Sequence, residues 1–113
     1  MKKAIIISSM AILSACSAKL ALPTQTDVNN VLTKYPDYTW NELVAGKWIY
    51  ENNCKSCHGL KEPSSRSEVK WNETVPRMVK KVNKKLGVEK IDSKKQELLL
   101  RYLITMSKVP KAK

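Results

Sequence analysis

The chain has 113 residues, of which 21 are lysine or arginine and 10 are aspartate or glutamate, so its formal net charge is +11. This length fits one small domain, and three cysteines are too few for a framework of disulfides. A basic chain attracts acidic proteins, anionic lipids or nucleic acids. We expect no nucleic-acid partner, because the first residues of the chain predict export from the cytoplasm.

The first fifteen residues have the features of an export signal. Two lysines precede the apolar run 4–12, which is too short to span a bilayer as a permanent helix. Leu-Ser-Ala before Cys16 resembles the bacterial lipoprotein signal, in which cleavage leaves a lipid-bearing cysteine at the N-terminus. We therefore expect removal of residues 1–15 and a lipid anchor on Cys16, with ordinary secretory cleavage as the alternative. Ser17 slightly favours the outer membrane, so the protein is expected on the periplasmic side of a bacterial membrane.

Residues 16–38 are predicted to form a tether between this lipid and the domain. The segment contains prolines, threonines and asparagines, and about 20 flexible residues reach on the order of 25 Å. One or two helical turns fit residues 27–34, and Pro36 stops them. The alternative is that part of the segment packs on the domain.

The domain is expected to span residues 39–113 and to begin with a helix over residues 40–52. Thr39 and Glu42 match a capping box, in which each side chain accepts a hydrogen bond from the backbone N–H of the other residue. Gly46 costs such a helix about 1 kcal/mol relative to alanine. The simplest reason to have glycine there is a second helix that crosses closely over it.

This helix leads into Cys54-Lys55-Ser56-Cys57-His58, the pattern for covalent attachment of a c-type haem. Each thiol adds across one vinyl group of the porphyrin, and the short turn between them sets both sulfurs along one edge of the macrocycle. His58 then supplies the proximal imidazole ligand of the iron. We therefore expect one covalently bound haem c, held by Cys54 and Cys57.

Two other uses of this motif fit the sequence less well. A structural zinc site needs four protein ligands, and beyond the motif only Cys16 and carboxylates are of a suitable type. A thioredoxin-like redox pair needs a βαβ setting, and the sequence has no strand pattern.

Residues 59–70 are expected to form a loop around one edge of the haem. A middle helix follows over residues 71–86, with Pro76 in its first turn and Gly87 directly after its end. Its apolar face carries Val75, Met78, Val79, Val82 and Leu86. Its opposite, basic face carries Arg77, Lys80, Lys81, Lys84 and Lys85.

The last helix is expected over residues 93–107, capped by Asp92 or Ser93, with Ser93 and Gln96 as a second capping box. Its apolar stripe consists of Leu98, Leu99, Tyr102, Leu103 and Met106. Since the chain has neither alternating apolar runs nor a hairpin turn signal, the predicted fold class is all-α.

His58 is the only histidine in the chain. A second imidazole is therefore excluded as an iron ligand, and so is a distal histidine for peroxide or dioxygen chemistry. The sixth ligand is then methionine, lysine, an α-amine, water or nothing. Cleavage of the signal leaves two methionines, Met78 and Met106, and the commoner use of either is packing in a core.

With these elements placed, residues 39–107 resemble the class I cytochromes c. The positions that carry the resemblance are Gly46, Tyr50, Cys54 and Cys57 on the first helix and motif, and Leu99 and Tyr102 on the last helix. In that family a glycine and an aromatic residue of the first helix contact the crossing C-terminal helix. The resemblance implies a small cytochrome c fold, with three to four helices around one covalently bound haem, and a methionine as the sixth ligand.

Within this family, Trp71 followed seven residues later by Met78 resembles small bacterial members in which such a segment lies over the haem. Some of these are electron-accepting subunits of periplasmic dehydrogenases. We therefore expect Met78 as the distal ligand, with Met106 as the alternative, because Met106 should point with Tyr102 into the helix crossing. Trp71 or Arg66 is expected either to bind a haem propionate or simply to pack.

The function expected from these features is that of a monohaem c-type cytochrome, a one-electron carrier rather than an enzyme. The alternatives are a cytochrome subunit of a periplasmic dehydrogenase complex, and a haem-based sensor or ligand-binding protein. Signal cleavage removes two lysines and leaves a net charge of +9. This charge should attract an acidic redox protein, or a dehydrogenase or oxidase domain, while anionic lipid headgroups compete for the same basic face.

Overall fold

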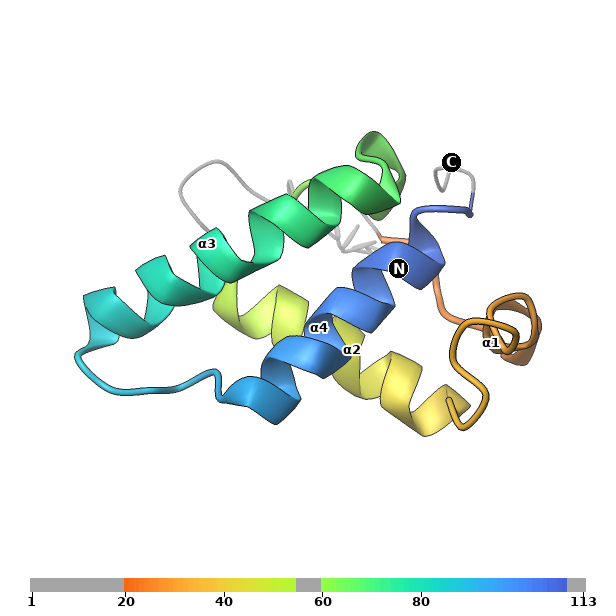
Figure 1. The fold of residues 1–113 in the computed structure, drawn as a ribbon, viewed down its shortest axis with the longest axis horizontal. Helices are drawn as coiled ribbons and strands as arrows, with labels where there is room; N and C mark the ends of the chain where they lie inside the picture. Colours follow the sequence, from red (N-terminus) through yellow and green to blue (C-terminus); the bar gives the residue numbers. More distant parts are fainter. Residues whose placement is uncertain (1–19, 55–59, 110–113) are drawn as a thin grey trace, which may run out of the picture.

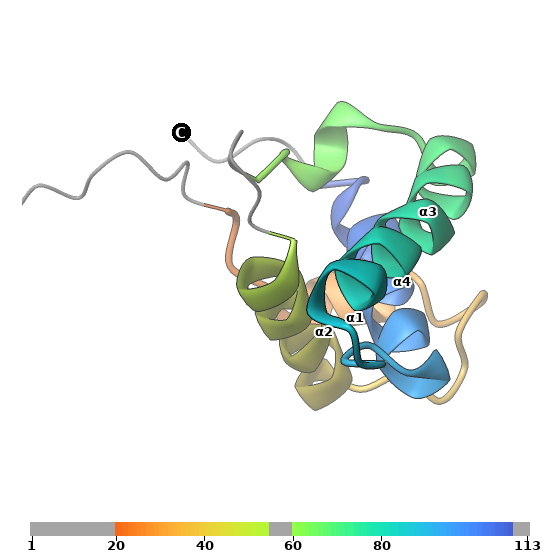
Figure 2. The same ribbon diagram turned by 90° about the vertical axis from the view of Figure 1, so that its left-hand side faces the viewer.

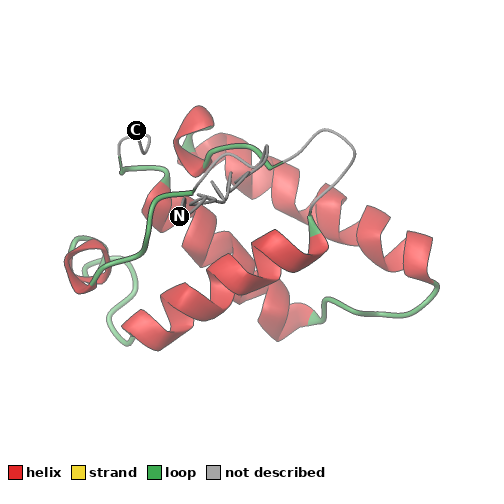
Figure 3. Ribbon diagram, turned by 180° about the vertical axis from the view of Figure 1, so that it is seen from behind, coloured by secondary structure: helices red, strands yellow, loops and turns green. Residues whose placement is uncertain are grey.

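The computed structural model describes residues 20–54 and 60–109 (Figure 1). Its elements are α1 (Gln25–Asn29), α2 (Trp40–Asn53), the short 3-10 helix η1 (Pro63–Ser65), α3 (Glu68–Leu86) and α4 (Ser93–Met106). Only helices and loops occur in these two ranges (Figure 3), which confirms the all-α fold class. Cys16, Cys57 and His58 lie outside the described residues.

The centre of the fold is the crossing of α2 and α4 (Figure 1). A Cβ atom at Gly46 would overlap the backbone carbonyl oxygen of Leu98 and the Cβ atom of Tyr102. One turn further along α2, the ring of Tyr50 lies 5.9 Å from the ring of Tyr102, centroid to centroid. The close crossing predicted from Gly46 is therefore confirmed, and the glycine is required because the α4 backbone occupies the space of a side chain.

Both ends of α2 follow the sequence pattern closely. Thr39 caps the helix, and its hydroxyl accepts a hydrogen bond from the Glu42 N–H while the Glu42 carboxylate accepts one from the Thr39 N–H. The predicted capping box is thus confirmed. At the other end Cys54 is the C-cap residue, and its N–H donates to the Tyr50 carbonyl oxygen over 3.0 Å.

Helix α3 begins three residues earlier than predicted. The Ser67 hydroxyl accepts a hydrogen bond from the Lys70 N–H and caps the helix, so residues 68–70 are helical and not part of a loop. Pro76 consequently lies in the interior of α3 and not in its first turn. Its ring is on the exposed side, where water can satisfy the carbonyl that loses a partner. The predicted end is confirmed, because Gly87 adopts the left-handed conformation with φ 72°.

Helix α4 is capped by Asp92, whose Oδ1 accepts a hydrogen bond from the Lys95 N–H over 2.9 Å. The second capping box expected from Ser93 and Gln96 is wrong, because Ser93 is already the first helical residue. The C-terminal half of α4 is buried almost completely: Leu99, Tyr102, Leu103, Ile104, Thr105 and Met106. Other elements therefore surround this helix on several sides.

Residues 20–38 belong to the packed domain. Leu20, Val28, Val31 and Tyr38 are buried in the same core as the long helices, and α1 is held by its own capping box at Thr24. Of the two possibilities drawn from the sequence, packing on the domain is the one found for this segment. The expected boundary between residues 38 and 39 does not separate two bodies, because apolar residues on both sides share one core.

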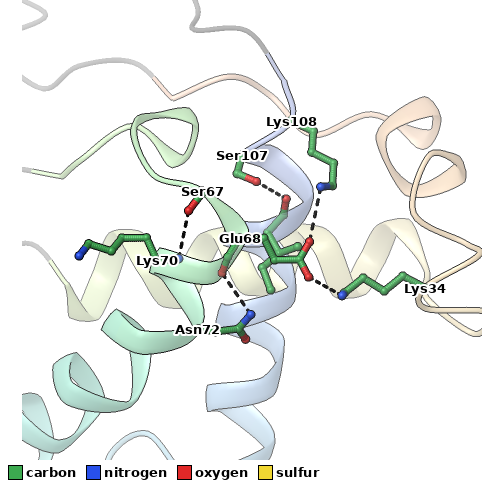
Figure 4. A network of polar contacts seen from close by, with 8 residues as sticks. Lys34, Ser67, Glu68, Lys70, Asn72, Ser107 and Lys108 are labelled. Atoms are coloured by element: carbon green, nitrogen blue, oxygen red, sulfur yellow. Dashed lines mark hydrogen bonds and ion pairs between the residues drawn. The ribbon is translucent and has the colours of Figure 1, made fainter.

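A single carboxylate links three parts of the chain at one end of the domain. Glu68, the first residue of α3, pairs with Lys34 from the turn after α1 and with Lys108 after α4, the latter over 3.5 Å (Figure 4). The hydrogen bond from Lys34 is the main cause that lowers the pKa of Glu68. Exposed pairs of this kind contribute little stability each, but together they fix the position of residue 34 relative to both helices.

Candidate functional site

A cavity of about 710 Å³ lies between the C-terminal end of α2 and one face of α3. Both helices pack on α4 but make few contacts with each other (Figure 2), so their separation leaves the space between them unfilled. The cavity is within the size range of small-molecule and cofactor sites. Its lining residues are Tyr50, Asn52, Asn53, Cys54, Lys61, Arg66, Trp71, Thr74, Arg77, Met78, Lys81, Val82, Lys85, Leu86 and Lys90.

The wall formed by α3 is mainly apolar. Trp71, Thr74, Met78 and Val82 lie three or four residues apart and therefore share one face of the helix. Trp71 is fully buried, whereas Met78 and Val82 are partly buried. The Thr74 hydroxyl donates to the Lys70 carbonyl oxygen over 2.7 Å, so its donor is used within the helix. The middle of this wall therefore offers the thioether of Met78 and little other polar chemistry.

The end of α2 supplies the opposite wall. The Tyr50 hydroxyl donates to the Lys61 carbonyl oxygen over 2.6 Å and ties the chain after the motif back to the helix. Burial raises the pKa of the Cys54 thiol to about 11. This thiol is therefore protonated near neutral pH and lacks the low pKa that is typical of a reactive or catalytic cysteine.

Asn53, beside Cys54, leaves a polar atom without a partner in this wall. Its Nδ2 donates to the Ile49 carbonyl oxygen over 2.9 Å. Its Oδ1 is buried and has no hydrogen-bond partner among the residues that the structure describes. A buried acceptor of this kind normally has a donor, so leaving this oxygen unpaired costs the fold stability.

The rim of the cavity is strongly basic. The charged side chains that line it are Lys61, Arg66, Arg77, Lys81, Lys85 and Lys90. No aspartate or glutamate is among the described lining residues. Lysine and arginine stems cover apolar surface while their charged ends stay in water, so this rim suits a ligand with an apolar body and anionic groups.

Trp71 and Arg66 differ in what they can offer an anionic ligand. The Trp71 indole N–H donates to the Pro63 carbonyl oxygen over 2.8 Å, and is committed to holding η1 against α3. The Arg66 guanidinium stacks over the Trp71 ring, 5.1 Å from its centroid. Of the two residues singled out from the sequence, Trp71 acts in packing, and Arg66 is the one that brings a positive charge to the cavity lining.

The structure brings two of the predicted site residues to one cavity. Cys54, the first thiol of the motif, and Met78 both line it. Met106 is 2% exposed, belongs to the core at the end of α4, and is not among the lining residues. Within residues 20–54 and 60–109, no group of three or more histidine, cysteine, aspartate or glutamate side chains could hold a metal ion.

Several lining residues were not recognised from the sequence. Asn53 and Lys61 flank the motif closely, and this proximity was a usable signal. Lys90 lies in the loop between α3 and α4, and nothing in its sequence neighbourhood points to the cavity. Whether Lys90 reaches the cavity depends on the angle between α3 and α4, which the sequence does not show.

No family model matches the chain, and the searches of curated proteins and of solved structures also found no match. Among the described helices, none combines the length and the apolar character needed to cross a bilayer.

Proposed function

We propose that the protein is a monohaem c-type cytochrome that carries one electron at a time outside the cytoplasm. The observation that carries this proposal is the position of Cys54. The first thiol of the C-x-x-C-H motif lines a cofactor-sized cavity whose other wall, α3, presents the thioether of Met78. A motif match alone is weak, but a cavity that contains both its first cysteine and a candidate axial ligand gives the motif a structural context.

The residues of the cavity fit a haem. Its volume of about 710 Å³ and its apolar α3 wall suit a macrocycle, and its basic rim suits two propionates. When bound, haem c supplies the ferric–ferrous couple. In this proposal Cys54 and Cys57 hold the group covalently, His58 is the proximal ligand, and Met78 is the distal ligand. Trp71 and the rest of the α3 face exclude water.

The arrangement of the helices supports the finer proposal of a cytochrome c fold. The crossing of α2 and α4 at Gly46, with the Tyr50 and Tyr102 rings in contact, lies directly beside the cavity. This is the geometry that the resemblance to class I cytochromes c implies. The buried position of Met106 in the same core supports its role in packing rather than in ligation.

We further propose that an acidic redox protein, or a dehydrogenase or oxidase domain, docks at the basic rim. Of the four lysines chosen from the sequence, Lys81 and Lys85 line the cavity, whereas Lys80 and Lys84 do not. A permanent dehydrogenase subunit would use the same surface. A sensor or ligand-binding protein would need an open sixth position, which carbon monoxide binding to the reduced protein would reveal.

Retention of haem after acid–acetone extraction tests the central proposal. The exported protein should keep its haem stain on a denaturing gel, because thioether bonds survive this treatment. Cys54→Ala should lose one of the two bonds, and the double variant Cys54→Ala, Cys57→Ala should lose all covalent haem. Asn41→Ala, an exposed position on α2, serves as the control and should stain like the original protein. Complete extraction of haem from the unaltered protein would overturn the proposal.

A further inference from the structure

The chain is fixed to the domain from residue 20 onward. Leu20 is only 8% exposed and is part of the core. Three residues later, the Pro23 carbonyl oxygen accepts a hydrogen bond from the Trp40 indole N–H over 3.1 Å. The chain is therefore held in the core at Leu20 and at the beginning of α2 at Pro23, so residues 20–23 do not act as a spacer.

This packing shortens the link between the domain and a lipid on Cys16. Leu20 follows Cys16 by four positions, and four residues span at most about 14 Å. The inference rests on the proposed lipidation of Cys16. Where that lipid is inserted in a bilayer, the surface around Leu20 cannot leave the membrane by more than this distance, whereas a tether over residues 16–38 would allow about 25 Å.

Two exposed apolar side chains lie near the point where the chain from Cys16 joins the domain. Leu22 is 77% exposed, and Trp40, which the hydrogen bond to Pro23 holds next to it, is 43% exposed. Tryptophan is favoured at membrane interfaces, because its ring is apolar while its N–H can stay hydrogen-bonded. Two carboxylates of this part of the chain, Asp27 and Glu42, accept hydrogen bonds from backbone N–H groups in helix caps, so their charges are partly satisfied within the protein.

We propose that Leu22 and Trp40 form a membrane-contact surface on which the protein rests against the bilayer. Figure 1 shows that α1 lies beside the N-terminal end of α2. The cavity is lined by residues at the other end of α2, and the 14 residues of this helix span about 20 Å. Electrostatic attraction is screened within about 8 Å at physiological salt. With α2 standing along the membrane normal, the rim residues near the C-terminal end of α3, Lys81 and Lys85, are too far from the lipid headgroups to be drawn to them. That end of the cavity then faces the aqueous side, where a soluble partner can reach it.

Photocrosslinking in the full-length lipidated protein tests this orientation. A benzophenone amino acid replaces Leu22 in one variant and Val88 in another. Val88 is a suitable control because it is also exposed, at 63%, and lies between the cavity residues Leu86 and Lys90. The host is a vesicle of phosphatidylethanolamine and phosphatidylglycerol. We expect lipid adducts at position 22 to exceed those at position 88 several-fold, and Cys16→Ser to abolish them.

A fluorescence measurement provides a second readout with milder changes. Brominated lipids should quench tryptophan emission in the original protein. Trp40→Phe should remove most of this quenching, whereas Trp48→Phe should not, although Trp48 is more exposed, at 61%. Equal or reversed lipid adducts at positions 22 and 88, protein adducts at position 22, or no adducts at either position would each overturn the proposed surface. Haem staining of the same samples is scored separately, so loss of the haem would overturn the cytochrome assignment and leave this result intact.

Discussion

Alanine substitutions of Met78 and Met106 should affect different properties of the protein. Met106 is 2% exposed in the core, so Met106→Ala leaves a cavity and should lower the free energy of unfolding by about 2–5 kcal/mol. In a domain of this size each kcal/mol corresponds to about 4–8 °C in Tm. Met78 is only partly buried and lines the cavity, so its truncation removes fewer protein contacts. Any change in Tm should come mainly from loss of the proposed bond to the haem iron.

Absorption spectra of the oxidised and reduced protein separate the two roles. A methionine–iron bond gives a sulfur-to-iron charge-transfer band in the oxidised state. Met78→Ala should abolish this band and allow the reduced protein to bind carbon monoxide. Val82→Ala is the matched control, because Val82 is also a partly buried residue of the α3 wall but has no thioether. This control should keep the band, and so should Met106→Ala despite its lower stability.

The opposite pattern would refute this reasoning. Loss of the band in Met106→Ala and its retention in Met78→Ala would mean that α4 turns over the cavity when haem is bound. Retention of the band in both variants would show that neither methionine ligates the iron, and absence of the band in the original protein would leave the sixth position to another group.

Two further predictions follow from the helix crossing and from the basic rim. Gly46→Ala should lower the free energy of unfolding by about 1–3 kcal/mol in a urea titration, because the added methyl group overlaps the α4 backbone, although alanine favours a helix by about 1 kcal/mol; unchanged stability would contradict the close crossing. Lys81→Glu with Lys85→Glu should slow electron transfer to an acidic partner more than Lys80→Glu with Lys84→Glu, and the difference should shrink as salt rises. Equal slowing by both pairs, or rates independent of salt, would rule out docking at the cavity rim.

Local signals in the sequence were sufficient for much of the fold. The capping box at Thr39, the close contact at Gly46 and the left-handed end at Gly87 were all predictable, because each depends on residues near it or on the absence of a side chain. The start of α3 was missed. Pro76 was placed in a first turn by its preference, whereas the Ser67 cap and the hydrogen bond from Trp71 to Pro63 start the helix earlier.

Features that depend on long-range packing were the ones that the sequence left open. Val28 and Val31 are apolar residues separated by polar ones, so the sequence pattern does not predict their burial. Both are buried because the segment packs beside α4. Cys54 and Met78, both expected at the haem from the sequence, line one cavity. Four of the six charged rim residues, Arg66, Arg77, Lys81 and Lys85, were singled out from the sequence. Lys61 and Lys90 were not, because they lie in loops whose positions depend on how the helices pack.

The order in which the chain is synthesised gives the α4 packing a further consequence. Helices α2 and α3 both pack on α4, and α4 is the last helix of the described residues. The central crossing needs both Gly46 and Leu98, so the core cannot close until α4 has been synthesised. Cys54 is not shielded by that core until then. Under the proposed function, late closure leaves an interval in which an enzyme that attaches haem can reach the motif as an unfolded peptide.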